Sequence, residues 1–224
     1  MEERRKLNPL IPILAGLLVL VSALCIFLLI KKNKAEQLAE TYKNSYDSIV
    51  EEMESAKRAE EEAKQKQEQE AKDYQSQYND LVYSMLDDAV LAENIGNLII
   101  SVWHNAIWEV SDVETDKYTK VNSVIVSDFN DALMNLFNDA EYSRNLSTLS
   151  DNQWQVKEKM KKMLNPPEGY ENAFKALESM YNSYISFTNI VLRCEGSLES
   201  FSNDFGDADE NLNEQYHGAE LYVK

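Results

Sequence analysis

The side chains with the most capacity for chemistry form an aromatic cluster in one short segment. Trp103, His104 and Trp108 lie within six positions of each other. On a helix, His104 and Trp108 share a face at a spacing of four residues, while Trp103 points to a neighbouring face. Tyr170, in a later segment, supplies another ring. Packing between helices accounts for such residues, and so does contact with a ligand or partner, so these four are the candidate contact site.

The sequence lacks the patterns that support catalysis or metal binding. His104 and His217 are the two histidines, and no zinc-like Cys/His spacing accompanies them. The segment Asp207–Asn211 begins like a calcium loop, but Leu212 stands where that loop needs a glycine. No glycine-rich phosphate loop and no nucleophile–base spacing is present. We therefore predict no catalytic residue, no metal site and no cofactor, and we expect that the protein is not an enzyme.

The cysteines and the charge set further limits. Cys25 lies in a long apolar run and Cys194 is the other cysteine, so the rest of the chain has no internal disulfide framework. We expect Cys194, in an apolar helical stripe, to be a buried thiol. Six basic and two acidic residues give residues 1–34 a charge of +4, and the whole chain carries −17, which leaves −21 on residues 35–224. This negative charge repels phosphates and argues against a nucleic-acid partner.

Residues 81–224, which hold the candidate contact site, have the pattern of amphipathic helices. Ser150 and Gln153 have the spacing of a capping box at a helix start. Gly196 suits a left-handed helix end, and a fifth segment would then start at Ser197. Each segment is apolar on one face, so we predict an all-α fold with an acidic up-and-down bundle of four or five helices. Apolar residues recur every three or four positions in four segments, at about 81–110, 121–140, 150–164 and 167–198.

Residues 31–80 are charged and have the composition of a long exposed helix. From 51 to 72 there is no glycine, proline or β-branched residue, and four Glu residues each precede a Lys or Arg by four positions. Such pairs stabilise an exposed helix. The segment is therefore either a solvated spacer or a coiled-coil-like stalk that forms a homodimer. An apolar heptad seam, interrupted from Glu60 onward, supports the second alternative at Tyr42, Tyr46, Ile49 and Met53.

Residues 9–30 are the most hydrophobic segment, with twenty-two residues that carry no charge and basic residues on both sides. As a helix the segment would span roughly 33 Å, about the thickness of a bilayer's hydrocarbon core. A cleaved signal peptide usually has a shorter apolar run, and Leu24 before Cys25 does not suit a lipidation site. We therefore predict one retained transmembrane anchor, preceded by a short basic tail (1–8).

The order of these segments suggests how the protein acts. We call the predicted bundle, residues 81–224, the head. Lys and Arg flank the anchor almost equally, but a basic tail before an uncleaved first span favours a head outside the cytoplasm. We expect a membrane-anchored scaffold or adaptor that binds another protein. The alternative is a sensor or ligand-binding head with a small pocket near Trp103, Trp108 and Tyr170, and an enzyme comes third. The layout resembles that of bacterial envelope and division scaffold proteins, an analogy of architecture alone.

Overall fold

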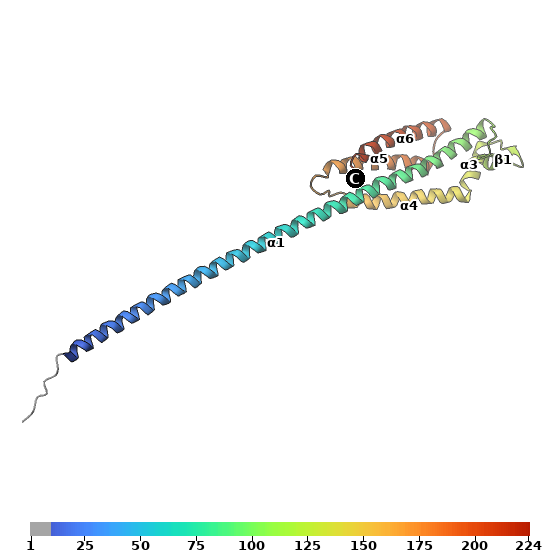
Figure 1. Ribbon diagram of the computed structural model, residues 1–224. Helices are drawn as coiled ribbons and strands as arrows, with labels where there is room; N and C mark the ends of the chain where they lie inside the picture. The colour runs from blue at the N-terminus through green and yellow to red at the C-terminus, as the bar shows by residue number, and fades with distance from the viewer. Residues whose placement is uncertain (1–9) are drawn as a thin grey trace, which may run out of the picture. The chain divides into compact units, whose positions relative to one another are not determined.

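The computed structural model describes residues 10–224, and within them the chain is all-α, as predicted. A two-residue antiparallel hairpin, β1 (Lys120–Val121) with β2 (Val124–Ile125), is the one sheet in these residues. The predicted basic tail (1–8) lies outside the described residues. The helices, shown in Figure 1, are α1 (Leu10–Ile107), α2 (Asp116–Thr119), α3 (Phe129–Phe137), α4 (Ala140–Lys162), α5 (Glu171–Arg193) and α6 (Leu198–Glu220).

Contacts along the chain divide it into two compact units, Met1–Gln65 and Lys66–Lys224. We call the second the head unit. Its burial on α1 begins before residue 81, because Tyr74 is 6% exposed and Tyr78 is fully buried. The Tyr74 hydroxyl donates to the Met163 carbonyl oxygen at 3.3 Å, and the Tyr78 hydroxyl donates to that of Ala219 at 2.7 Å. These bonds tie α1 to the C-terminal ends of α4 and α6.

Among the described residues, one helix is long and apolar enough to cross a membrane. It is α1, and its most apolar 18-residue window lies near the N-terminus with a mean hydropathy of 1.9 and no burial. The exposed side chains in this region include Leu20, Phe27 and Ile30. Apolar side chains that nothing in the chain covers suit a hydrocarbon environment.

The core of the head unit is formed by the C-terminal part of α1 together with α4, α5 and α6, which run side by side in Figure 1. The three-and-four spacing predicted from residue 81 onward is confirmed, because Met85, Ile95 and Ile99 all face the core. Gly96, beside them, allows close packing with α6, since a Cβ atom there would overlap the Phe205 ring. The largest side chains with almost no exposure are Tyr78, Leu81, Met85, Ile99, Leu136, Leu149, Met163, Leu177, Met180, Tyr184, Phe187 and Phe201.

The helix predicted over 121–140 is wrong in its first part, where residues 120–125 form the hairpin, and only residues 129–137 of that range form a separate helix. Asn122 and Ser123 have φ angles of 51° and 69°, in the left-handed region, and they form the turn between β1 and β2. The next helix, α3, starts only after Asp128, whose carboxylate accepts a hydrogen bond from the Asn130 backbone N–H at 2.8 Å. The apolar periodicity therefore spans a hairpin and a shorter helix.

The predicted helix start at Ser150 is also wrong. The Asp139 carboxylate accepts hydrogen bonds from the backbone N–H groups of Glu141 and Tyr142 at 2.9 and 3.0 Å, so α4 begins at Ala140. Ser150 is an exposed residue inside that helix. An Asp that satisfies free N–H groups at a helix start is as effective a cap as a capping-box serine, so the sequence offers two start signals and Asp139 is the one used.

The break near Gly196 is present and creates a separate final helix. Cys194 and Gly196 have φ angles of 40° and 95°, which turn the chain after α5. Ser197 then caps α6 in a reciprocal capping box with Ser200. The predicted fifth segment from Ser197 is therefore confirmed, and the turn brings residues 194–199 beside the end of α1 that carries Trp103.

Candidate functional site

Trp103 lies at a junction of three helices. Its side chain is 6% exposed. Its ring centroid lies 5.9 Å from that of Phe129 on α3, in a stacked arrangement, and 6.4 Å from that of Phe201 on α6. Most of the Trp103 surface is thus used to hold α1 against α3 and α6, with one edge left to line a groove.

His104, in the last turn of α1, and Trp108, the first residue after this helix, form an exposed pair. Their rings are stacked with centroids 4.5 Å apart, which confirms that they share a face. Trp108 is 58% exposed. The His104 Nδ1 atom lies 3.0 Å from the Asn105 side-chain oxygen. This pair is an accessible aromatic surface.

Tyr170 is not part of this cluster. It lies before α5 and packs edge-on against Tyr74, with the ring centroids 5.2 Å apart. Tyr74 and Trp103 are 29 residues apart on α1, which is roughly 43 Å along a helix. The structure therefore places Tyr170 far from Trp103 and Trp108, and it shows no pocket shared by the three.

An apolar groove of about 720 Å³ opens beside Trp103. Three of its side chains are exposed although they are apolar, at 41% for Ile107, 59% for Met134 and 40% for Phe137. The sequence shows the apolar spacing of α3, with Phe129, Leu133 and Phe137 four residues apart. It does not show the groove, because the groove also needs residues from the turn between α5 and α6. The Trp103 groove is lined by Trp103, Ile107, Phe129, Asn130, Leu133, Met134, Phe137, Cys194, Gly196, Ser197, Leu198 and Glu199.

Cys194 in this groove has no chemical activation. Burial raises the pKa of its thiol to about 11. Because the thiolate is the nucleophilic form, a thiol with this pKa is unreactive at neutral pH. The groove therefore offers surface for contact and no nucleophile.

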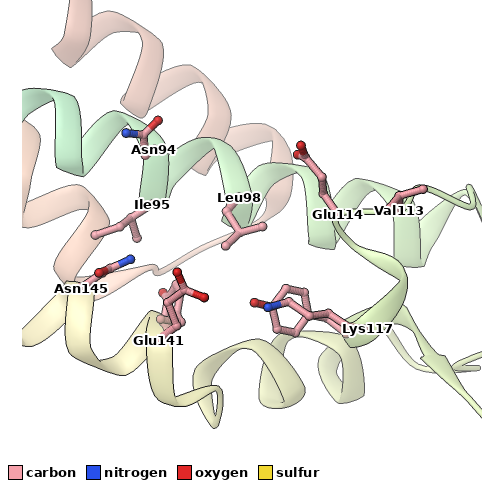
Figure 2. Close-up of a pocket in the computed structure, with 10 residues that line it drawn as sticks. Asn94, Ile95, Leu98, Val113, Glu114, Lys117, Glu141 and Asn145 are labelled. Carbon is pink, nitrogen blue, oxygen red and sulfur yellow. The ribbon is translucent and has the colours of Figure 1, made fainter.

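A second concavity, shown in Figure 2, has a volume of about 470 Å³ and a more polar lining. Sequence analysis missed it, because its residues come from three separate elements and none belongs to a motif. We call it the Glu141 pocket. It is lined by Asn94, Ile95 and Leu98 of α1, by Val113, Glu114, Lys117 and Tyr118 at and before α2, and by Glu141, Tyr142 and Asn145 of α4.

A buried carboxylate lies in the interior of the head unit. Asp88 on α1 is 4% exposed. It accepts hydrogen bonds from the Asn152 side-chain amide on α4 at 2.6 Å and from the Tyr184 hydroxyl on α5 at 2.9 Å. Burial raises the pKa of Asp88, and the two hydrogen bonds act in the opposite direction. Both oxygens are engaged by core helices, so Asp88 links three helices and is not poised for chemistry.

The proposed stalk residues lie on α1 within the first unit. Tyr42, Tyr46, Ile49 and Met53 are all more than half exposed. Each is therefore accessible for contact with another chain. In the part of the chain that is described, no group of three or more His, Cys, Asp or Glu side chains is arranged to hold a metal ion.

Comparison with known proteins adds no family. No protein-family model matches the chain, and neither does any curated protein or solved structure. The function is therefore argued from the surfaces described above.

Proposed function

We propose that this protein is a single-pass membrane-anchored scaffold or adaptor that binds another protein through the Trp103 groove. The observation that carries the proposal is the apolar lining of that groove, where Ile107, Met134 and Phe137 remain exposed. Aromatic and Met side chains around a concave surface are typical of protein contact sites. The stacked His104 and Trp108 pair, next in sequence to the groove residues Trp103 and Ile107, is a second exposed aromatic surface at this end of the head unit.

The head in this proposal is an up-and-down bundle of α1, α4, α5 and α6, with the Trp103 groove at one end. The contacts between α1 and the two ends of α6 support this layout. Trp103 contacts Phe201 near the start of α6, whereas Tyr78 bonds to Ala219 near its end, so α1 and α6 run in opposite directions. A short α3 beside the groove adds exposed apolar surface without a place in the main bundle.

The anchor in this proposal is the apolar run at residues 9–30, with the head outside the cytoplasm. Support comes from the exposed apolar window of α1 and from the basic tail that precedes it in the sequence. The charge of −21 on residues 35–224, derived from the sequence, favours a partner surface rich in Lys and Arg.

Site-specific photo-crosslinking in native membranes tests the proposal. A photoreactive residue at Met134, inside the groove, should give a discrete adduct with one protein. The same residue at Tyr83, which is 51% exposed on α1 outside the groove, is the control. The Met134 adduct should disappear when Ile107→Glu places a charge in the groove. Identical adducts from both positions, or an adduct that survives Ile107→Glu, would show that the groove is not the binding surface.

A further inference from the structure

The Glu141 pocket is separate from the Trp103 groove and shares no lining residue with it. It lies between α1 and α4, and Val113, Glu114 and Lys117, before and in α2, lie at one end of it in Figure 2. Its volume of about 470 Å³ falls in the range of sites that hold small organic molecules. The pocket therefore needs its own explanation.

The floor of the pocket is apolar and firmly held. Ile95, Tyr118 and Tyr142 each have 3% exposure, and Leu98 is half-buried beside them. Buried side chains of this kind are fixed by the surrounding core, so the floor is preformed. It offers aliphatic and aromatic surface to the apolar part of a ligand.

The lysine of the pocket already has partners. The Lys117 ammonium lies 4.6 Å from the centre of the Tyr118 ring and 3.6 Å from an Asp139 carboxylate oxygen. The Tyr118 hydroxyl and the Asp139 carboxylate keep the pKa of Lys117 above its ordinary value. Asp139 thus offsets this positive charge within the protein.

The remaining polar groups of the pocket lie at its rim, where Glu114, Glu141 and Asn94 are exposed to solvent and Asn145 is half-buried. Within residues 10–224, neither glutamate forms an ion pair, and the side-chain amides of Asn94 and Asn145 form no hydrogen bond within the protein. In Figure 2, Glu141 and Lys117 extend from opposite sides into the space beside Leu98. The rim of the pocket thus carries two exposed carboxylates without an ion pair in the described residues, and Glu141 is the one that extends over the apolar floor.

We propose that the Glu141 pocket binds a small organic amine, with its ammonium group at Glu141 and its apolar body on the floor formed by Ile95 and Leu98. Two unpaired carboxylates against one lysine that is already paired favour a cation over an anion. A hydrogen bond to a carboxylate is stronger when its donor is charged, and the side-chain amide oxygens of Asn94 and Asn145 can accept hydrogen bonds from the remaining N–H groups of the ammonium. This site goes beyond the proposed protein binding and does not depend on it.

Three ligands that share a phenyl ring and a two-carbon spacer test the charge preference. They are 2-phenylethylamine, phenylalanine and 3-phenylpropionate, titrated calorimetrically into the full chain in nanodiscs of zwitterionic lipid. We expect one saturable site for 2-phenylethylamine, weaker binding of phenylalanine and none of 3-phenylpropionate. Ring protons of the amine should show nuclear Overhauser contacts to the methyl groups of Ile95 and Leu98. Tighter binding of 3-phenylpropionate, or no saturable binding of the amine, overturns the proposal.

Variants separate a specific site from general attraction to an acidic protein. Glu141→Gln should weaken amine binding by about tenfold or more, the effect expected for the loss of one charge-assisted hydrogen bond. Glu178→Gln, an exposed residue of α5 outside the pocket, is the matched control and should leave the affinity unchanged. Equal effects of both substitutions overturn the proposal. Ile107→Glu, which disables the Trp103 groove, should not alter amine binding, so the two proposals fail independently.

Discussion

At the scale of single residues, the most unusual group is a carboxylate inside a helical core. The ionised form of Asp88 is destabilised because burial removes its hydration. This cost is larger than the stabilisation that the hydrogen bonds from Asn152 and Tyr184 provide. The same three side chains join α1, α4 and α5. A polar link of this kind favours one arrangement of the helices over others in which apolar faces slide past each other.

Asp88 should make the stability of the head unit depend on pH. Its pKa in the folded protein is raised above the ordinary value of 3.8, so the folded state holds the proton more tightly than the unfolded state does. This contribution to stability is full below pH 3.8 and is lost as the pH rises through the raised pKa. Urea unfolding of Asp88→Asn should therefore show a smaller loss of stability between pH 4 and pH 7 than the natural chain shows.

An exposed carboxylate elsewhere on α1 provides the control for this measurement. Asp80 is exposed and is not among the groups that shift the pKa of Asp88, so Asp80→Asn removes one carboxylate without touching the core. It should leave the pH dependence close to that of the natural chain. If both variants flatten the curve equally, the effect comes from the overall negative charge and not from Asp88.

At the scale of elements, the presence of helices was predictable from the sequence, and the residues at which they begin and end were less so. The all-α class follows from periodicity that burial at Met85, Ile95 and Ile99 confirms. The hairpin at 120–125 was not predictable, because two non-glycine residues, Asn122 and Ser123, adopt positive φ there. Side chains that meet across elements were the hardest to predict. Trp103 was nominated from its own segment, but its partners Phe129 and Phe201 come from two others.

Two substitutions should show which of the two start signals begins α4. Asp139→Ala removes the acceptor for two backbone N–H groups and should lower the free energy of unfolding by about 1 kcal/mol. Ser150→Ala, in the middle of the helix, should change it by less than about 0.5 kcal/mol. Chemical denaturation measures both. Asp139→Asn keeps the cap but removes the charge near Lys117, so a large loss in this variant would assign the effect to the ion pair instead.

At the scale of the whole molecule, the proposed activity depends on features that occur in separate parts of the chain. The apolar window near the N-terminus suits a membrane, and the head unit carries the Trp103 groove and the Glu141 pocket. A membrane anchor confines the head to a surface, which raises its effective concentration toward any partner held at the same membrane. Weak contacts at the groove can then suffice for function.

Self-association through the first unit is the last prediction. The apolar seam at Tyr42, Tyr46, Ile49 and Met53 is exposed in the single chain, and Glu60 interrupts its continuation. If the seam forms a homodimer, Ile49→Glu with Met53→Glu would bury unpaired charge and cost several kcal/mol, enough to abolish association. Sedimentation of the full chain in detergent measures this.

A matched pair of substitutions decides between a dimer seam and a solvated spacer. Ser48 and Ser55 lie off the seam on the same stretch of α1, so Ser48→Glu with Ser55→Glu adds equal charge without entering a predicted contact. This control should remain dimeric while the Ile49 and Met53 variant becomes monomeric. Because a heptad contact acts through its own face, equal behaviour of the two variants would contradict the seam. A natural chain that is already monomeric at tens of micromolar would leave residues 31–80 as a spacer between anchor and head.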